Sequence, residues 1–171
     1  MKKIFFVFIL SLFIQNKLQA QFPYPVGSFT SHPELNKFVG DWKWGSGADS
    51  VILHLEKQFV HYPQPLNFDE ELLVGWHKYI KNGTIVETSL QYSGLPYIGG
   101  HSSILAGMKS PIKLYGSFRE HTKSKKCDLY LTMINSSFTQ MDWRLLESRG
   151  LKSQGFLYGF TLPVNIVLIK Q

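Results

Sequence analysis

The chain has 171 residues, a formal net charge of +6 and one cysteine, Cys127. A single cysteine excludes an intramolecular disulfide, so the fold must depend on its hydrophobic core even in an oxidising compartment. A chain of this length buries enough surface for one self-supporting domain.

The first twenty residues have the pattern of an export signal. A positive start at residues 1–3 precedes an apolar run at residues 4–14, and Ala20 is a small residue suited to cleavage. The run is too short for a spanning helix, which needs about 20 apolar residues. We therefore expect residues 1–20 to be a signal peptide. The mature protein would be periplasmic or extracellular, with no membrane span after cleavage.

The charge that remains after cleavage is small. Three lysines of the leader would be removed, leaving 15 Lys and Arg against 12 Asp and Glu. Nucleic-acid binding needs a concentrated basic face, so we expect no nucleic-acid partner. One basic cluster lies between two strand-like runs, and we interpret it as a solvated hairpin loop rather than a phosphate site: Lys123, Lys125 and Lys126.

The chain after the leader begins with a region rich in Pro, Gly, Ser and Thr, residues 21–32, which predicts an extended lead-in. Residues 33–38 predict one helical turn, because proline is favoured in a first turn. A strand follows with Trp42 and Trp44 at i and i+2, which places both indoles on one face. We expect this pair to be part of a β core.

The clearest hairpin signal is the dipeptide Asn82-Gly83, which favours a two-residue type I′ turn between two strand-like runs. A regular register from that turn predicts four cross-strand pairs: Lys81 with Thr84, Tyr79 with Val86, Lys78 with Glu87, and His77 with Thr88. One face then carries charges. The other carries none, and we expect it to be interior; among its residues are His77, Tyr79, Thr88 and Tyr92.

Alternating runs recur to the end of the chain, in residues 112–121, 129–133, 140–147 and 164–170. We predict an all-β fold of about eight to ten strands with a short N-terminal helical turn. Sequential hairpins suit an antiparallel up-and-down barrel or a two-sheet sandwich, and the long strands around the hairpin favour the barrel. Residues 33–171 would form this single domain.

Parts of the chain resemble two families. Residues 37–42, Lys-Phe-Val-Gly-Asp-Trp, resemble the first motif of lipocalins. That resemblance implies a lipocalin-like barrel with a ligand at its open end, and makes Gly40, Trp42 and Trp44 structural residues that close the barrel. It also makes Arg144 a candidate for the basic residue that covers the tryptophan. Residues 73–79, 89–97 and 158–163 resemble an uncharacterised family of small secreted bacterial proteins, which implies secretion but no activity.

Catalytic and metal-binding patterns are weak. The six histidines include no pair at i, i+4 and there is no Cys-x-x-Cys, so we predict no metal site or cofactor, although His54, His61 and His77 could converge from separate strands. No Gly-x-Ser-x-Gly is present. Lysines near Cys127 could lower its pKa, but a lone thiol beside a loop is more often incidental. We name no catalytic residue, and an enzyme remains a minor alternative.

Ligand binding is the function that these patterns favour. The predicted interior set His77, Tyr79, Thr88 and Tyr92 combines aromatic surface with polar tips, which is typical of small-ligand cavities. We expect a small apolar or amphipathic ligand. The same side chains could instead fill a solid core. The alternative function is a secreted interaction module without an internal ligand, which would recognise a partner through a loop such as residues 93–101.

Overall fold

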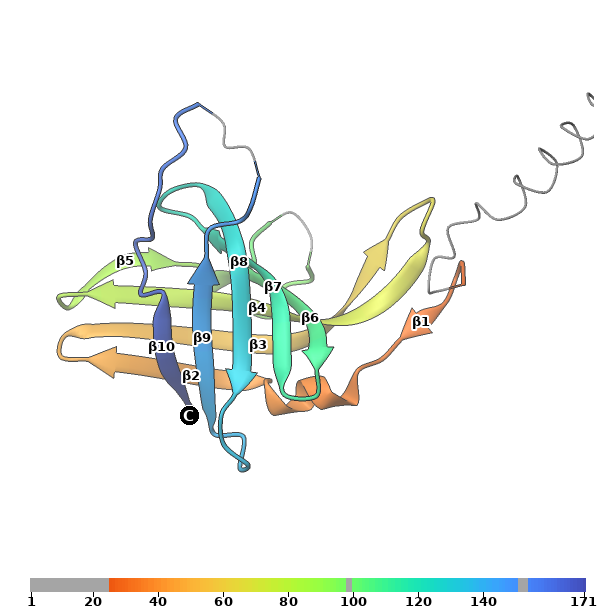
Figure 1. Ribbon diagram of the computed structural model, residues 1–171, viewed down its shortest axis with the longest axis horizontal. Helices are drawn as coiled ribbons and strands as arrows, with labels where there is room; N and C mark the ends of the chain where they lie inside the picture. Colours follow the sequence, from red (N-terminus) through yellow and green to blue (C-terminus); the bar gives the residue numbers. More distant parts are fainter. Residues whose placement is uncertain (1–24, 98–99, 151–153) are drawn as a thin grey trace, which may run out of the picture.

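The computed structural model describes residues 25–97, 100–150 and 154–171. The expected signal peptide, residues 1–20, lies outside the described residues. The described residues contain ten strands and two short 3₁₀ helices (Figure 1): β1 Phe29–Thr30, η2 Pro33–Lys37, β2 Gly40–Ser46, β3 Asp49–Tyr62, β4 Phe68–Lys81, β5 Thr84–Thr88, η3 Leu90–Tyr92, β6 Ile104–Ser110, β7 Lys113–Glu120, β8 Lys125–Met133, β9 Gln140–Leu146 and β10 Asn165–Lys170.

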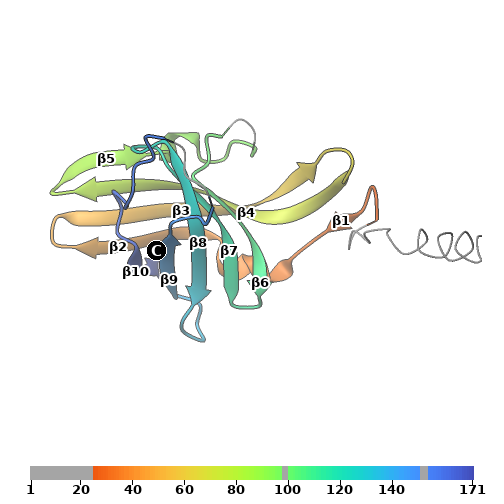
Figure 2. The ribbon, with the colours of Figure 1, turned by 45° about the horizontal axis from the view of Figure 1, so that its top comes forward.

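Eight of the strands close an antiparallel barrel in the order β4-β3-β2-β10-β9-β8-β7-β6, with β6 pairing back onto β4. Strands β2 to β5 run crosswise to β6 to β10 (Figures 1 and 2). Most neighbours in the barrel are also neighbours in the chain, as in an up-and-down barrel. The prediction of an all-β antiparallel barrel is confirmed.

Strand β4 has three partners along the edge opposite β3, namely β1, β6 and β5. Residues 73–75 pair with β6, and residues 78–81 pair with β5. The β3–β4 hairpin extends beyond the barrel, where β1 pairs with it in parallel (Figure 1). Strand β3 is a single strand of 14 residues. The extended β3–β4 hairpin therefore places some of its side chains outside the barrel core.

The predicted helical turn and the predicted strand with Trp42 and Trp44 are both present, as η2 and β2. Trp42 is fully buried, and its indole N–H donates to the Phe38 carbonyl at 2.8 Å. Trp44 is partly buried and packs against the core. The basic group over the Trp42 ring is Lys170, with Nζ 5.4 Å from the ring centroid. Arg144 is exposed on β9, so the expectation that it covers the tryptophan is wrong.

The described interior is filled by its own side chains. Large residues with no more than 1% exposure come from strands all round the barrel; they include Leu53, Leu55, Leu73, Phe118, Leu129 and Trp143. Small barrels are commonly packed in this way, without an internal cavity. No helix within the described residues has the length and apolar character needed to cross a membrane.

The register of the β4–β5 hairpin differs from the prediction. Asn82 and Gly83 both have positive φ, as a type I′ turn requires. A bulge then shifts the register between Tyr79 and Ile80, so that Glu87 lies opposite Tyr79 and Thr88 opposite Lys78. One extra residue in a strand moves every later side chain to the other face. Glu87 therefore turns inward, and the predicted pairing of Lys78 with Glu87 is wrong.

Candidate functional site

The structure separates the four residues predicted to line a ligand cavity. His77 is fully buried, and Tyr79 is 3% exposed and belongs to the hydrophobic core. Thr88 is exposed, because the bulge turns it outward. Tyr92 lies in η3, half-buried and stacked on His101 with ring centroids 4.5 Å apart. The four side chains therefore do not line one cavity.

A polar cluster, here called the histidine cluster, lies where β4 leaves β6 and pairs with β5. Its members are His77, Glu87, Ser89, Ser103 and His121. His77 Nδ1 lies 2.7 Å from Ser103 Oγ, and Nε2 lies 2.9 Å from Glu87 Oε1. The second distance suits an ion pair, but the ring N–H is not aligned on the carboxylate as a hydrogen bond. Thus the His77 imidazole lies between Ser103, 26 positions away in the chain, and the buried carboxylate of Glu87.

Ser89 and His121 complete the histidine cluster. Ser89 Oγ lies 2.6 Å from Ser103 Oγ and accepts the backbone N–H of His77 at 3.0 Å. The His121 ring stacks on His77 with centroids 6.1 Å apart, and its Nε2 lies 3.4 Å from Ser103 Oγ. Burial lowers the pKa of His121, an effect that outweighs the nearby Glu87 carboxylate. The His121 ring is thereby held in its neutral form near neutral pH.

Glu87 is the charged centre of the cluster. Burial alone would raise its pKa, but His77 and three donors from the β7–β8 turn outweigh that effect and lower the pKa to about 2. The donors are the backbone N–H of His121 at 2.9 Å, and the backbone N–H at 2.8 Å and hydroxyl of Thr122. Glu87 is therefore a buried, ionised carboxylate that accepts hydrogen bonds from the β7–β8 turn.

The arrangement of Ser103, His77 and Glu87 has the order of a nucleophile, base and acid. Ser103 Oγ, however, already contacts His77, Ser89 and His121, and the residue is 2% exposed. An attacking oxygen needs an open side facing the substrate. We conclude that the histidine cluster holds β4, β5, β6 and the β7–β8 turn together and that it does not present a nucleophile.

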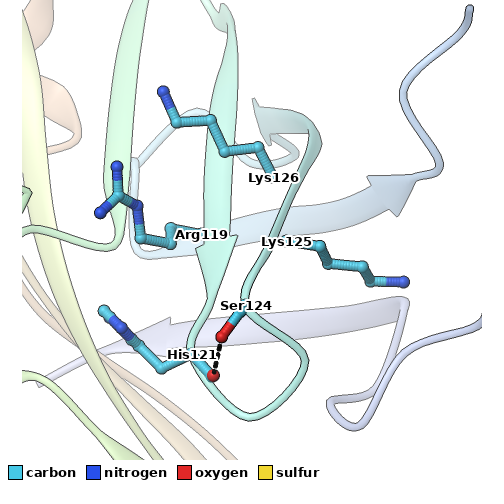
Figure 3. A pocket seen from close by; sticks show the side chains of 5 residues that line it. All are labelled: Arg119, His121, Ser124, Lys125 and Lys126. Carbon is cyan, nitrogen blue, oxygen red and sulfur yellow. Dashed lines mark hydrogen bonds between the residues drawn. The ribbon is translucent and has the colours of Figure 1, made fainter. Parts of the chain in front are cut away.

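A polar pocket of about 270 Å³ opens beside the histidine cluster (Figure 3). We call it the cationic pocket; it is lined by Arg119, His121, Ser124, Lys125 and Lys126. Arg119 on β7 and Lys126 on β8 lie directly opposite each other in the sheet. Figure 3 shows that their side chains extend to the same side, whereas that of Lys125 points the other way.

Arg119 and Lys126 have no carboxylate partner among the residues that the structure describes. The Arg119 guanidinium donates to the Gly100 carbonyl at 3.2 Å and packs on that glycine, where a Cβ would lie 2.5 Å from Nη1. Gly100 thus fixes the direction of the arginine side chain. Two unpaired cations face the same pocket.

Lys125 has a different environment from that of Lys126, the next residue of β8. It is 6% exposed, and its Nζ lies 2.8 Å from Glu147 Oε1 and 3.8 Å from Glu120 Oε2. The carbonyls of Leu157 and Gly159 also accept from it, and the Phe160 ring lies 4.5 Å away. The expectation of a solvated hairpin loop is therefore wrong for Lys125, and Lys126, although exposed, lies in β8 and not in a loop.

Cys127 lies inside the barrel and is fully buried. Burial raises the pKa of its thiol to about 12, and the nearby Lys125 only partly offsets this. The lysines therefore do not activate it. Among the described residues, no group of three or more His, Cys, Asp or Glu is placed to hold a metal ion.

Local sequence signals did not reveal the cationic pocket. The alternating run over residues 112–121 contains Arg119 and His121, but the sequence predicts a loop at Lys126. The pairing of β7 with β8 brings it opposite Arg119. Cross-strand pairing of this kind depends on where the turn falls, which composition alone does not determine.

Comparison with known proteins assigns the chain to a family without assigning an activity. The profile of a family of unknown function, DUF6705, matches residues 1–171. No curated protein and no solved structure matches the chain.

Proposed function

Because the chain belongs to this family of unknown function, and membership assigns it no activity, we propose a function from the site itself: an exported barrel that binds a small amphipathic anion at the cationic pocket. The observation that carries the proposal is the cross-strand pair of Arg119 and Lys126, which lines a pocket of about 270 Å³ without a carboxylate partner in the described part of the chain.

Electrostatics favour an anion in this pocket. Like charges directly opposite each other on a sheet destabilise it. A carboxylate or phosphate between Arg119 and Lys126 would offset that repulsion and accept hydrogen bonds from both side chains, and such charge-assisted bonds are among the strongest in proteins. The neutral ring of His121 on the pocket wall can donate one hydrogen bond to a ligand and accept another. The pocket therefore suits the head group of an anion.

A more apolar hollow lies beyond a small one that adjoins the cationic pocket. Arg119 and Lys126 also line a small adjoining hollow that reaches Tyr97. Tyr97 in turn lines a hollow of about 340 Å³ with Phe59, Val60 and Pro96. A short apolar tail could lie there while the anionic head remains at the cations. We therefore place the expected amphipathic ligand on the outer surface of the barrel, because side chains fill the described interior.

Calorimetric titration of the mature protein with octyl phosphate, with octanol and with inorganic phosphate tests the proposal. We expect octyl phosphate to bind, inorganic phosphate to bind more weakly, and octanol to bind least. Arg119→Ala and Lys126→Ala should each weaken octyl phosphate binding by about 10-fold, the loss of one charge-assisted bond. Lys43→Ala is the matched control, since Lys43 is exposed on β2.

NMR titration of the His121 ring provides a second readout. An anion in the pocket favours the imidazolium, so octyl phosphate should raise the His121 pKa above its value in the free protein. Equal binding of octanol and octyl phosphate, or binding unaffected by both pocket substitutions, would overturn the proposal.

A further inference from the structure

A second basic surface lies on the same outer wall of the barrel, about 13 Å along β7 and β8 from the Arg119–Lys126 pair, as four residues of extended strand span. We call it the tyrosine–lysine face. It consists of Lys109, Lys113, Tyr115, Tyr130 and Arg144. It borders an open hollow of about 310 Å³ on the outward side of β6 to β9.

Two tyrosines form the centre of this face. Tyr115 and Tyr130 are opposite each other in the β7–β8 register, with ring centroids 5.0 Å apart. Tyr115 is 44% exposed. Lys109 Nζ lies 5.9 Å from the Tyr115 centroid and 5.4 Å from that of Tyr130. Two accessible rings side by side on rigid strands make an aromatic platform with a cation held over it.

The cations around the platform are free to bind. Within the described ranges, no ion pair is formed by Lys109, Lys113 or Arg144. Arg144 lies next to Tyr130 in the β8–β9 register, so a planar guanidinium adjoins the platform. Asp142 lines the same hollow as the only acid among its lining residues. The face therefore combines three cations without an ion-pair partner in the described ranges, one exposed ring, one partly exposed ring and one carboxylate.

We propose that the tyrosine–lysine face binds an acidic polysaccharide. Tyrosine rings pack against the apolar C–H face of a sugar ring, and lysine and arginine pair with its carboxylate or sulfate groups, for which the planar guanidinium is well suited. Asp142 accepts hydrogen bonds from sugar hydroxyls. The hollow is open on the wall of the barrel, so a chain can continue past it in both directions. This inference stands apart from the small ligand proposed for the cationic pocket.

The same features disfavour nucleic acid. A polyphosphate backbone carries one negative charge per nucleotide and is bound by a dense basic surface. Here Asp142 lies within the hollow, and Asp128 lies on β8 between Tyr130 and Lys126. Asp128 accepts a hydrogen bond from the Ser148 hydroxyl at 2.8 Å. Carboxylates among the cations suit a polymer whose charges are spaced by neutral hydroxyl-bearing groups.

Affinity electrophoresis of the mature protein tests this inference, in gels that contain polygalacturonate, chondroitin sulfate, neutral dextran or single-stranded DNA. We expect at least one of the two acidic polysaccharides to retard the protein more than dextran or DNA does. The double variants Tyr115→Ala/Tyr130→Ala and Lys109→Ser/Lys113→Ser should each weaken this binding by about 10-fold or more. Lys43→Ser/Lys81→Ser removes the same charge from exposed positions on β2 and β4 as the matched control.

Four outcomes would overturn the inference: no retardation by either acidic polysaccharide, equal retardation by DNA, equal loss in the control variant, or binding that depends only on Arg119 and Lys126. Circular dichroism of each variant shows whether the barrel is intact. If the wild-type protein fails to bind octyl phosphate but is still retarded by an acidic polysaccharide, the small-ligand proposal alone is rejected.

Discussion

His77 Nε2 lies 2.9 Å from Glu87 Oε1 inside the barrel, and this contact exists because β5 contains one more residue than a regular hairpin would. A regular register places Glu87 on the outer face, opposite Lys78. The bulge places it instead on the face that carries His77 and Tyr79. The bulge in β5 therefore brings Glu87 into the histidine cluster.

Glu87 should make the protein sensitive to acid. Its pKa is lowered from 4.5 to about 2 by folding, so its stabilisation is present above pH 4.5 and is lost as pH falls from 4.5 to about 2. A difference of this size corresponds to about 3 kcal/mol in the free energy of unfolding. Urea unfolding of the wild type at several pH values should show this loss of stability. The Glu87→Gln variant should be less stable than the wild type at pH 7, and its stability should change little as the pH falls through the same range.

A matched control for that experiment is Asp69→Asn. Asp69 also contacts a histidine, His61, at 2.9 Å, but both side chains are exposed. Exposed pairs contribute little, so we expect a change within about 0.5 kcal/mol. Equal effects of the two substitutions would show that burial of Glu87 is not what matters.

Lys125→Met should strongly destabilise the barrel. The substitution removes the cation from between Glu147 and the fully buried Glu120. Leaving a buried charge uncompensated typically costs about 3–5 kcal/mol. Denaturant unfolding measures the loss, and Lys126→Met on the exposed side of the same strand is the control, with an expected change within about 0.5 kcal/mol.

The double variant Glu120→Gln/Lys125→Met separates charge from packing. If the uncompensated carboxylate causes the loss, the double variant should be more stable than Lys125→Met alone. A double variant no more stable than the single one would attribute the loss to packing against the Phe160 ring instead.

Cys127 should be unreactive in the folded protein. With a pKa raised to about 12, its thiolate fraction at pH 8 is on the order of 10⁻⁴, and the side chain is fully buried. Iodoacetamide at pH 8 should label the unfolded chain within minutes and the native protein far more slowly, as mass spectrometry would show. Equally fast labelling of native protein would mean that this part of β8 opens readily.

Lys170→Met tests the closed end of the barrel. Lys170 lies over the Trp42 ring and donates to the Lys37 carbonyl at 3.3 Å. Loss of the cation–π contact and of that hydrogen bond should lower the free energy of unfolding by about 1 kcal/mol. Arg144→Met, on the exposed side of β9, should change it by less than about 0.5 kcal/mol. The opposite ranking would show that Arg144 is the more important basic residue.

The sequence by itself determined the β architecture. Alternation at Leu129, Leu131 and Met133 marks a strand with one buried face, and Asn82-Gly83 marks a hairpin turn, because both signals arise from local backbone geometry. The 3₁₀ turn before Trp42 is equally local. These features require no knowledge of distant residues, so the barrel fold could be predicted from them.

Only the tertiary structure decided which polar groups meet. A one-residue bulge turned Glu87 inward and Thr88 outward. The pairing of β7 with β8 set Lys126 beside Arg119, while Lys125, one position earlier, faces the interior beneath residues 154–163. Strand faces alternate with period two, so a shift of one residue exchanges core for surface. Local propensity carries no information on such a shift, and for that reason the predicted ligand-lining set was separated in the fold.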